Sequence, residues 1–200
     1  MLEARGITFA HPGMRTPLYR DFDLVVDAGE RVAVSAPSGF GKTTLCRLLA
    51  GYERPQAGAI LVDGSPLPKR GACPVQLILQ HPETAVDPRM RMEQTLAEAG
   101  EVPQRLLDDL GIQKRWLTRF PHELSGGELQ RFCIARALAA RPRYLVADEI
   151  STMLDAVTQA QIWRFLVAET QDRGIGMLFV SHSPALTERI ATRVVHLARV

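Results

Sequence analysis

The stretch RVAVSAPSGFGKTTLCRLL, residues 31–49, decides the fold of this 200-residue chain. It begins with a short β-rich run, passes through a glycine-containing loop and ends in a segment whose leucines recur at helical spacing. The N–H groups at the start of a helix lack partners within the helix and carry the positive end of its dipole, so a loop that leads into them can surround an anion. The stretch therefore predicts a phosphate-binding loop between a strand and a helix.

The loop matches most of the pattern G-x-x-x-x-G-K-[ST]. Ala36 stands where the pattern has its first glycine, which costs little if φ is negative there and about 1–2 kcal/mol if it is left-handed. Lys42 is predicted to neutralise phosphate charge, and Thr43 to place its hydroxyl on Mg²⁺. For this motif alone, a Gly-Lys-Thr turn without a ligand is the alternative. The predicted nucleotide contacts in the loop are Ala36, Pro37, Ser38, Gly39, Phe40, Gly41, Lys42, Thr43 and Thr44.

Composition excludes several classes of protein. Hydrophobic residues make up 46% of the chain, which is enough for a packed core, and the net charge of +2 gives no electrostatic reason to expect nucleic acid as a partner. No apolar run approaches the roughly 20 residues that span a bilayer, and the first residues lack a signal-peptide core, so we expect a cytoplasmic protein. The widely spaced Cys46, Cys73 and Cys133 are predicted to be small buried hydrophobes rather than metal ligands or disulfides.

Strand and helix patterns alternate in the outer parts of the chain, which predicts an α/β fold with a mainly parallel sheet flanked by helices. Between residues 84 and 140 the patterns are helical, which predicts an inserted helical subdomain in one domain that covers 1–200, with 1–80 and 141–200 as the core. Strands are predicted within 7–9, 22–26, 31–36, 59–67, 75–82, 143–149 and 176–182, and helices within 44–52, 91–100, 103–112, 127–140 and 158–174.

Polar residues follow three of the predicted strands. Asp148 and Glu149 come where the apolar run YLVA ends, Gln80 follows VQLIL, and His182 follows GMLFVS. Ligands of such sheets lie at the carboxyl ends of the strands, where one carboxylate can hold Mg²⁺ and the next can orient an attacking water. Each of these residues taken alone is better explained as a polar strand end than as a catalytic group, so the prediction depends on their convergence near one phosphate loop.

The segment LSGGELQR, residues 124–131, begins a second notable helix. Ser125 and Glu128 form the S-x-x-E capping box that any well-capped helix could have. That reading leaves Gly126 and Gly127 unexplained, because each glycine weakens a helix by about 1 kcal/mol. Exposed N–H groups at a glycine-rich helix start predict a second anion site, and its separation from the first suggests a site shared between two chains.

Together these motifs resemble the ATP-binding cassette (ABC) ATPases over nearly the whole chain. The matching segments, in order, are APSGFGKTT, LILQHPE, LSGGELQR, YLVADE, STMLD and FVSH. The resemblance implies a P-loop NTPase core with an N-terminal antiparallel β-subdomain and the inserted helical subdomain. It also implies a head-to-tail cassette dimer that sandwiches two ATP molecules with Mg²⁺, hydrolyses them and thereby drives separate transmembrane permease subunits.

The resemblance assigns roles residue by residue. In one chain, Lys42, Thr43 and Thr44 would hold ATP and Mg²⁺, and Gln80 and Asp148 would contact the metal. Glu149 would polarise the attacking water, and His182 would sense the γ-phosphate. The dimer would be completed by Ser125, Gly126, Gly127 and Glu128, which meet the nucleotide of the other chain, and by Asp155 at the interface.

A finer resemblance is to cassettes of the peptide and nickel importers, carried by LILQHPETAVDPRM and DEISTMLDAVTQAQIW. It implies a second cassette subunit, identical or not, permease subunits and, indirectly, a solute-binding protein as partners, on the inner face of the cell membrane. One alternative is a soluble cassette protein in DNA repair, translation or enzyme assembly, although the long coiled-coil insertion or second cassette common in such proteins is lacking. A degenerate cassette that binds ATP and hydrolyses it poorly is another alternative.

Four departures from the family pattern stand out. Besides Ala36, Phe40 replaces a small residue in the loop and Ile150 replaces the proline after the glutamate. The aromatic residue that stacks on adenine is predicted to be His11, which offers less area than the usual ring, with Phe9 and Tyr19 as weaker candidates.

Overall fold

The computed structural model describes residues 1–14, 16–152 and 154–197, so Met153 of the STMLD motif lies outside the described residues. The strands are β1 Leu2–Phe9, β2 Tyr19–Val26, β3 Arg31–Ser35, β4 Ala57–Val62, β5 Ser65–Pro66, β6 Val75–Ile78, β7 Tyr144–Asp148, β8 Gly176–Val180 and β9 Arg193–His196. The α-helices are α1 Lys42–Leu49, α2 Met92–Ala97, α3 Gln104–Asp109, α4 Gly126–Ala139, α5 Ala156–Arg173 and α6 Pro184–Ile190. Short 3₁₀ turns are η1 Pro82–Thr84, η2 Lys114–Trp116 and η3 Pro121–Glu123.

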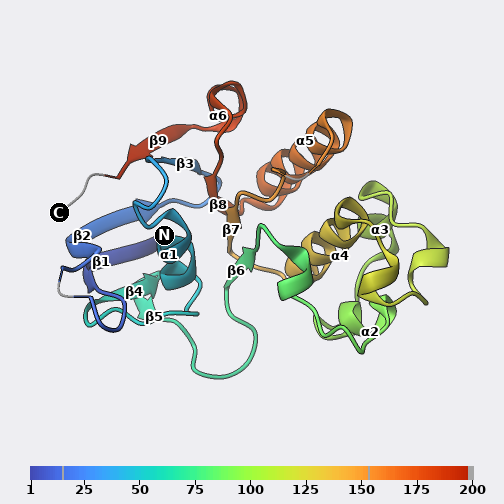
Figure 1. Ribbon diagram of the computed structural model, residues 1–200, viewed down its shortest axis with the longest axis horizontal. Helices are drawn as coiled ribbons and strands as arrows, with labels where there is room; N and C mark the ends of the chain where they lie inside the picture. The colour runs from blue at the N-terminus through green and yellow to red at the C-terminus, as the bar shows by residue number, and fades with distance from the viewer. Residues whose placement is uncertain (15, 153, 198–200) are drawn as a thin grey trace.

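The described strands form two sheets of different kinds. Five of them form a parallel sheet in the order β6-β7-β8-β3-β9, and four form an antiparallel sheet in the order β2-β1-β4-β5. Figure 1 places the antiparallel sheet and α1 at one end of the molecule and α2, α3 and α4 at the other. The predicted α/β class, with an N-terminal antiparallel sheet and helices on the parallel sheet, is confirmed.

The parallel sheet separates two hydrophobic cores, because successive side chains of a strand point to opposite faces. Val32, Val34 and Leu178 pack on one face with α1 and the antiparallel sheet. Ala33 and Phe179 pack on the other face with α4 and α5. Both faces are covered, which is why these strands read as continuous apolar runs.

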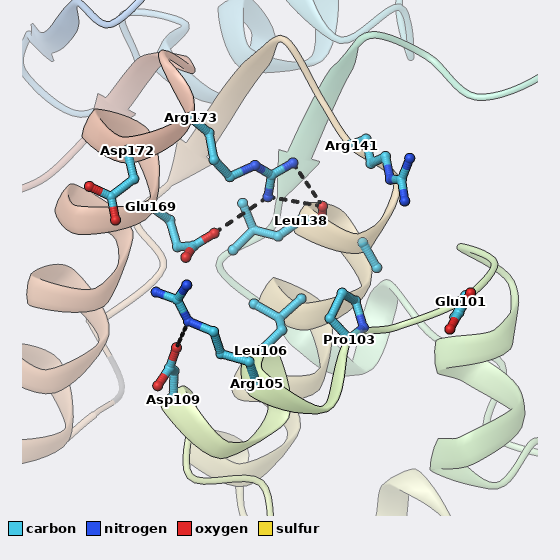
Figure 2. A pocket seen from close by; sticks show the side chains of 11 residues that line it. Glu101, Pro103, Arg105, Leu106, Asp109, Leu138, Arg141, Glu169, Asp172 and Arg173 are labelled. Atoms are coloured by element: carbon cyan, nitrogen blue, oxygen red, sulfur yellow. Dashed lines mark hydrogen bonds and ion pairs between the residues drawn. The ribbon is translucent and has the colours of Figure 1, made fainter.

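Helices α4 and α5 run side by side in the same direction. At their C-terminal ends, Arg173 of α5 donates two hydrogen bonds of 3.3 Å to the carbonyl of Leu138 in α4. Figure 2 shows this contact beside a hollow of about 420 Å³, where Arg105 of α3 faces Glu169 of α5. At the opposite end, a Cβ at position 127 of α4 would lie 3.3 Å from Leu154 at the approach to α5. The starts of both helices therefore share one end of the molecule.

The predicted helices and strands are all present, with bounds that differ by a few residues. The chain adds α6 and β9, for which no prediction was made, and β1 begins five residues before the predicted start at 7. The predicted turn between β4 and β5 is present, with left-handed Asp63 (φ 49°) and Gly64 (φ 75°). The subdomain boundaries at 84 and 140 remain a prediction.

The cysteines follow the prediction in part. All three are free thiols, and Cys46 and Cys133 are buried, as expected for small hydrophobes. Burial raises the pKa of Cys133 to about 11. The prediction is wrong for Cys73, which lies in the connection between β5 and β6 and is only half-buried.

Candidate functional site

The loop after β3 is held by a contact that only glycine permits. Gly41 caps the start of α1 with φ 88°, and a Cβ there would lie 2.6 Å from Leu18 and 2.9 Å from the hydroxyl of Tyr19. That hydroxyl donates a 2.9 Å hydrogen bond to the carbonyl of Gly41. Burial raises the pKa of Tyr19, so the phenol stays protonated and remains a donor. No motif in the sequence marks Tyr19 for this task.

The alanine in the loop carries no backbone strain. The left-handed non-glycine residues of the described chain are Asp21, Asp63, Arg141 and Glu149, and Ala36 is not among them. The left-handed positions of the loop are instead Gly39 (φ 82°) and Gly41. Ala36 therefore replaces the first glycine of the pattern at a position where an L-residue fits.

The lysine of the loop is buried against the loop backbone. Lys42 is 7% exposed, and its ammonium donates to the carbonyls of Ala36 at 2.9 Å and Pro37 at 3.3 Å. Ser38 and Gly39 are exposed, and Phe40 is half-buried. The ammonium thus lies inside the curve of the loop, where phosphate oxygens could replace the two carbonyls as acceptors.

The polar strand ends converge as predicted, because β6, β7, β8 and β3 are parallel neighbours. His182, after β8, contacts the carboxylate of Glu149, after β7, at 2.8 Å. Gln80, after β6, donates a 3.2 Å hydrogen bond to the hydroxyl of Thr152, which itself donates to the carbonyl of Glu149 at 3.0 Å. The sequence analysis did not single out Thr152, although it links these two strand ends.

Glu149 has a strained backbone at the centre of this group. Its φ is 51°, a left-handed conformation that costs an L-residue on the order of 1–2 kcal/mol. Its N–H donates to the carbonyl of Val180 at 3.2 Å, which keeps the residue on the sheet edge. Ile150, in place of the family's proline, is 2% exposed and packs in the core beneath it. Such outliers cluster at functional sites, where the surrounding structure maintains them.

Asp148 has a buried carboxylate with an unsatisfied oxygen. The residue is 3% exposed, and its Oδ1 has no hydrogen-bond partner among the described residues. Burial raises the pKa of Asp148. A hydrogen bond with the Thr43 hydroxyl and the positive charge of Lys42 lower it again in part. The described residues contain no cluster of three or more His, Cys, Asp or Glu able to hold a metal. A single carboxylate beside a threonine hydroxyl and a phosphate loop instead fits Mg²⁺, which binds through few protein ligands and substrate phosphates.

The predicted adenine-stacking position lies next to the loop. His11 is exposed, and its Nε2 lies 3.2 Å from the hydroxyl of Thr44. The two weaker candidates for stacking on adenine, Phe9 and Tyr19, do not fit. Each is only 3% exposed and presents no free ring face. His11 packs edge-on against Phe9, with ring centroids 5.1 Å apart.

The helix start at Ser125 forms the predicted capping box. The N–H of Glu128 donates to the Ser125 hydroxyl at 3.3 Å, and the N–H of Ser125 donates to the Glu128 carboxylate at 2.8 Å. The contact with Leu154 explains Gly127 by close packing, whereas a Cβ at Gly126 would meet nothing within 4 Å. The packing within one chain therefore gives no reason for glycine at 126.

Asp155 lies next to this helix start, as the N-cap of α5. Its carboxylate accepts from the N–H groups of Val157 and Thr158, both at 3.0 Å, and from the Thr158 hydroxyl at 2.6 Å. These hydrogen bonds, above all those from Thr158, lower the pKa of Asp155. Asp155 and residues 125–128 line one hollow. Figure 1 places α1 and its loop apart from α4, with β6 and β7 between them in that view.

The sequence of this chain matches a known protein family. A family model described as ABC transporter matches residues 19–152 of the chain. The chain belongs to the ABC transporter family. It is an ATP-binding cassette of that family.

Curated relatives of this family align with most of the chain. A probable peptide ABC transporter ATP-binding protein of Sinorhizobium fredii is 34% identical over 90% of the chain and 57% of its own length. The nickel import ATP-binding protein NikE of Rhodospirillum rubrum is 39% identical over 87% of the chain and 70% of its own length. The chain thus spans less than two thirds of the first relative.

Solved cassettes share the fold. A dimeric ATP-binding cassette in a post-hydrolysis state with ADP and Pi superposes with a TM-score of 0.86 at 21% identity, covering 98% of this chain and 94% of that one. An ATP-binding subunit of an ABC transporter superposes with a TM-score of 0.84 at 25% identity, covering 98% and 85%. In the part of the chain that the structure describes, no helix combines the length and the hydrophobicity needed to cross a bilayer.

We expect Ala36→Gly to change the dissociation constant for ATP by less than about twofold, because φ at this position already suits alanine. Equilibrium binding of a fluorescent ATP analogue measures the effect. Gly41→Ala is the matched control: its Cβ would overlap Leu18 and Tyr19, so it should destabilise the fold by about 1–3 kcal/mol and weaken binding. A large gain in affinity for Ala36→Gly would mean that alanine impairs the loop.

The left-handed backbone at 149 predicts that Glu149→Gly unfolds less readily than Glu149→Ala. Both variants lose the contact with His182, so their difference isolates the backbone. The free energy of unfolding should be about 0.5–1 kcal/mol higher for glycine, after allowing for the greater entropy that glycine loses on folding. Urea denaturation without nucleotide measures this difference, and an alanine variant of equal or higher stability would contradict it.

Proposed function

We propose that this chain is the ATP-hydrolysing subunit of an ABC importer, acting as a head-to-tail dimer of cassettes. The observation that carries the proposal is the division of anion-binding elements within one chain. One element is the loop around Lys42, and the other is the exposed helix start at Ser125 and Gly126. A second copy turned end to end would bring its helix start over the triphosphate held by the first loop, and the two-fold operation would complete both sites at once.

The proposed nucleotide contacts follow from the donors around the loop. The ammonium of Lys42 would exchange its two carbonyl acceptors for β- and γ-phosphate oxygens, with the N–H groups at the start of α1 on the same anion. His11 would stack on the base, because its exposed ring stands beside Thr44. The buried Asp148 carboxylate, the Thr43 hydroxyl and the Gln80 amide would hold Mg²⁺, which neutralises phosphate charge when bound.

The proposed chemistry is hydrolysis of the γ-phosphate by an in-line water. Glu149 would accept a hydrogen bond from that water and orient it. His182, 2.8 Å from the same carboxylate, would orient Glu149 and contact the γ-phosphate. Ser125 and Gly126 of the second copy would donate to the γ-phosphate, so hydrolysis would loosen the dimer.

The proposed cargo and partners come from the relatives. One is named a probable peptide transporter ATP-binding protein and another a nickel import ATP-binding protein, which supports a peptide, nickel or similarly small solute as cargo. We propose that the dimer docks on permease subunits at the inner face of the membrane, that Gln80 communicates with them, and that a solute-binding protein takes part indirectly. The opening and closing of the dimer would supply the motion.

Glu149→Gln tests the hydrolytic part. The amide keeps the shape of the side chain but cannot orient water as a carboxylate does, so we expect the ATPase rate to fall about 10²–10⁴-fold. ATP binding should be retained, and size-exclusion chromatography in ATP should show a dimer that the parent forms only transiently. A variant that hydrolyses ATP at the parental rate would remove Glu149 from this role.

Gly126→Ala tests the shared site, because its effects on stability and on function should have opposite signs. The new Cβ meets nothing within the chain, so helix propensity should raise the free energy of unfolding by up to about 1 kcal/mol. The same Cβ would obstruct the second copy's γ-phosphate, and the ATPase rate should fall at least about tenfold. Binding of ATP to the monomer should not change.

A mixing experiment sharpens this test. Gly126→Ala and Lys42→Ala should each be nearly inactive, but a mixed dimer contains one intact site, formed by Lys42 of one copy and Gly126 of the other. An equal mixture should therefore regain up to about a quarter of the parental activity. No recovery in a mixture that does form mixed dimers would contradict a shared site.

A further inference from the structure

A hollow of about 460 Å³ lies between α5 and α6, and none of the groups used in the proposed hydrolysis lines it. Its floor contains the buried Trp163 of α5 and the buried Ile190 of α6. The half-buried Val167 and Leu186 extend this apolar floor along the two helices. A hollow of this volume with an apolar floor suits a small ligand that has an apolar body.

Two arginines of this hollow are left without a partner. Arg164 of α5 and Arg189 of α6 are exposed, and neither makes a hydrogen bond or an ion pair with another described residue. The described residues that line the hollow include no acid. By contrast, Arg105 at the hollow of Figure 2 is paired with Asp109 at 3.2 Å. The hollow between α5 and α6 therefore presents two positive charges that the chain does not compensate.

The neutral polar side chains of the hollow are already engaged. The amide of Gln159 donates to the hydroxyl of Ser151 at 3.0 Å, and the hydroxyl of Ser183 accepts from the N–H of Leu186 at 3.3 Å. The two guanidinium groups are thus the main groups left to hold the polar part of a ligand. A guanidinium binds a carboxylate or a phosphate through paired hydrogen bonds, so that polar part is expected to be an anion.

The apolar and charged parts of the hollow are separated along its length. Helices α5 and α6 follow β7 and β8, which are parallel neighbours, so both helices begin near the same edge of the sheet. Ala156 and Ser183 line the hollow at these beginnings, whereas Arg164 and Arg189 come from later turns. Because α6 has only 7 residues, it is roughly 10 Å long, which favours a small molecule over a partner helix as the occupant.

We propose that this hollow binds a small amphipathic anion, a short aliphatic chain that ends in a carboxylate or a phosphate. The anionic head is held by Arg164 and Arg189, and the chain covers the apolar floor at Trp163 and Leu186. The site needs neither the nucleotide nor a second copy of the chain. It can therefore be tested on the nucleotide-free protein, and the result does not depend on the proposed function.

Calorimetric titration with octanoate measures the binding. We expect a dissociation constant of about 0.1–1 mM. Butanoate should bind at least about tenfold more weakly, because each buried methylene raises the affinity by about fourfold. Octan-1-ol should also bind at least about tenfold more weakly than octanoate, although general adhesion to apolar surface would favour the alcohol. Octyl phosphate, titrated in parallel, distinguishes the two heads, because the one that the arginines prefer binds more tightly.

The double variant Arg164→Gln/Arg189→Gln tests the two charges. Both side chains are exposed, so the fold should be spared, and thermal denaturation checks this. The affinity for octanoate should fall at least about tenfold, whereas that for octan-1-ol should not change. Arg115→Gln is the matched control, because Arg115 is exposed in η2 and does not line the hollow. A double variant that binds octanoate as tightly as the parent, or a parent that binds octan-1-ol as tightly as octanoate, would overturn the inference.

Fluorescence quenching by 8-bromooctanoate locates the ligand. The chain has two tryptophans, so Trp116→Phe leaves Trp163 as the emitter. Its emission should be quenched with the same dissociation constant that calorimetry gives, because Trp163 lines the hollow. The parent should show the same saturable quenching as a part of its total emission, which serves if Trp116→Phe does not fold. Saturable binding without quenching of Trp163 would place the ligand elsewhere and contradict the inference.

Discussion

The parallel pairing of β3, β7 and β8 fixes where each polar strand end emerges. Val34 lies opposite Val180 in one pair, and Asp148 lies opposite Val180 in the other, so the three strands end in one row of the sheet. The phosphate loop, the acidic pair and His182 leave the sheet from that row. A slip by one residue in either pairing would turn the apolar side chains to the wrong core and move the acids away from the loop. Core packing on both faces therefore also sets the geometry of the site.

A second constraint comes from α4 and α5. These two helices cover the face of the parallel sheet that points away from α1 and the antiparallel sheet. Because α4 and α5 run in the same direction and are tied at their ends by Arg173 and Leu138, their starts lie together. That places Asp155 beside the glycines of α4, although Asp155 lies 28 positions after Gly127 in the sequence. The resulting hollow lies on a different part of the molecule from the phosphate loop, which is why the two are most simply joined through a second copy.

Most of the fold could be predicted because its signals are local. The alternation of apolar strands and amphipathic helices, the capping box at Ser125 and the Asp-Gly turn are all short-range patterns. Strand β9 was not predicted because most of its residues are exposed, so its sequence lacks the alternation that a buried face produces. Three features of the site could not be predicted because tertiary contacts decide them. They are the conformation of Ala36, the left-handed backbone of Glu149 and the support of Gly41 by Tyr19.

The functional groups of the sheet edge differ in what a ligand would change. Lys42, Gln80 and Glu149 already have partners in the chain, so a nucleotide would exchange one hydrogen bond for another, and each exchange changes the free energy by only about 1 kcal/mol. Asp148 is different, because one of its oxygens is buried without any partner and burial disfavours its charged form. A cation brought in with the phosphates would supply both the missing partner and the compensating charge. In the proposed mechanism the metal would therefore enter together with the phosphates, with Lys42 and Gln80 adjusting around the complex.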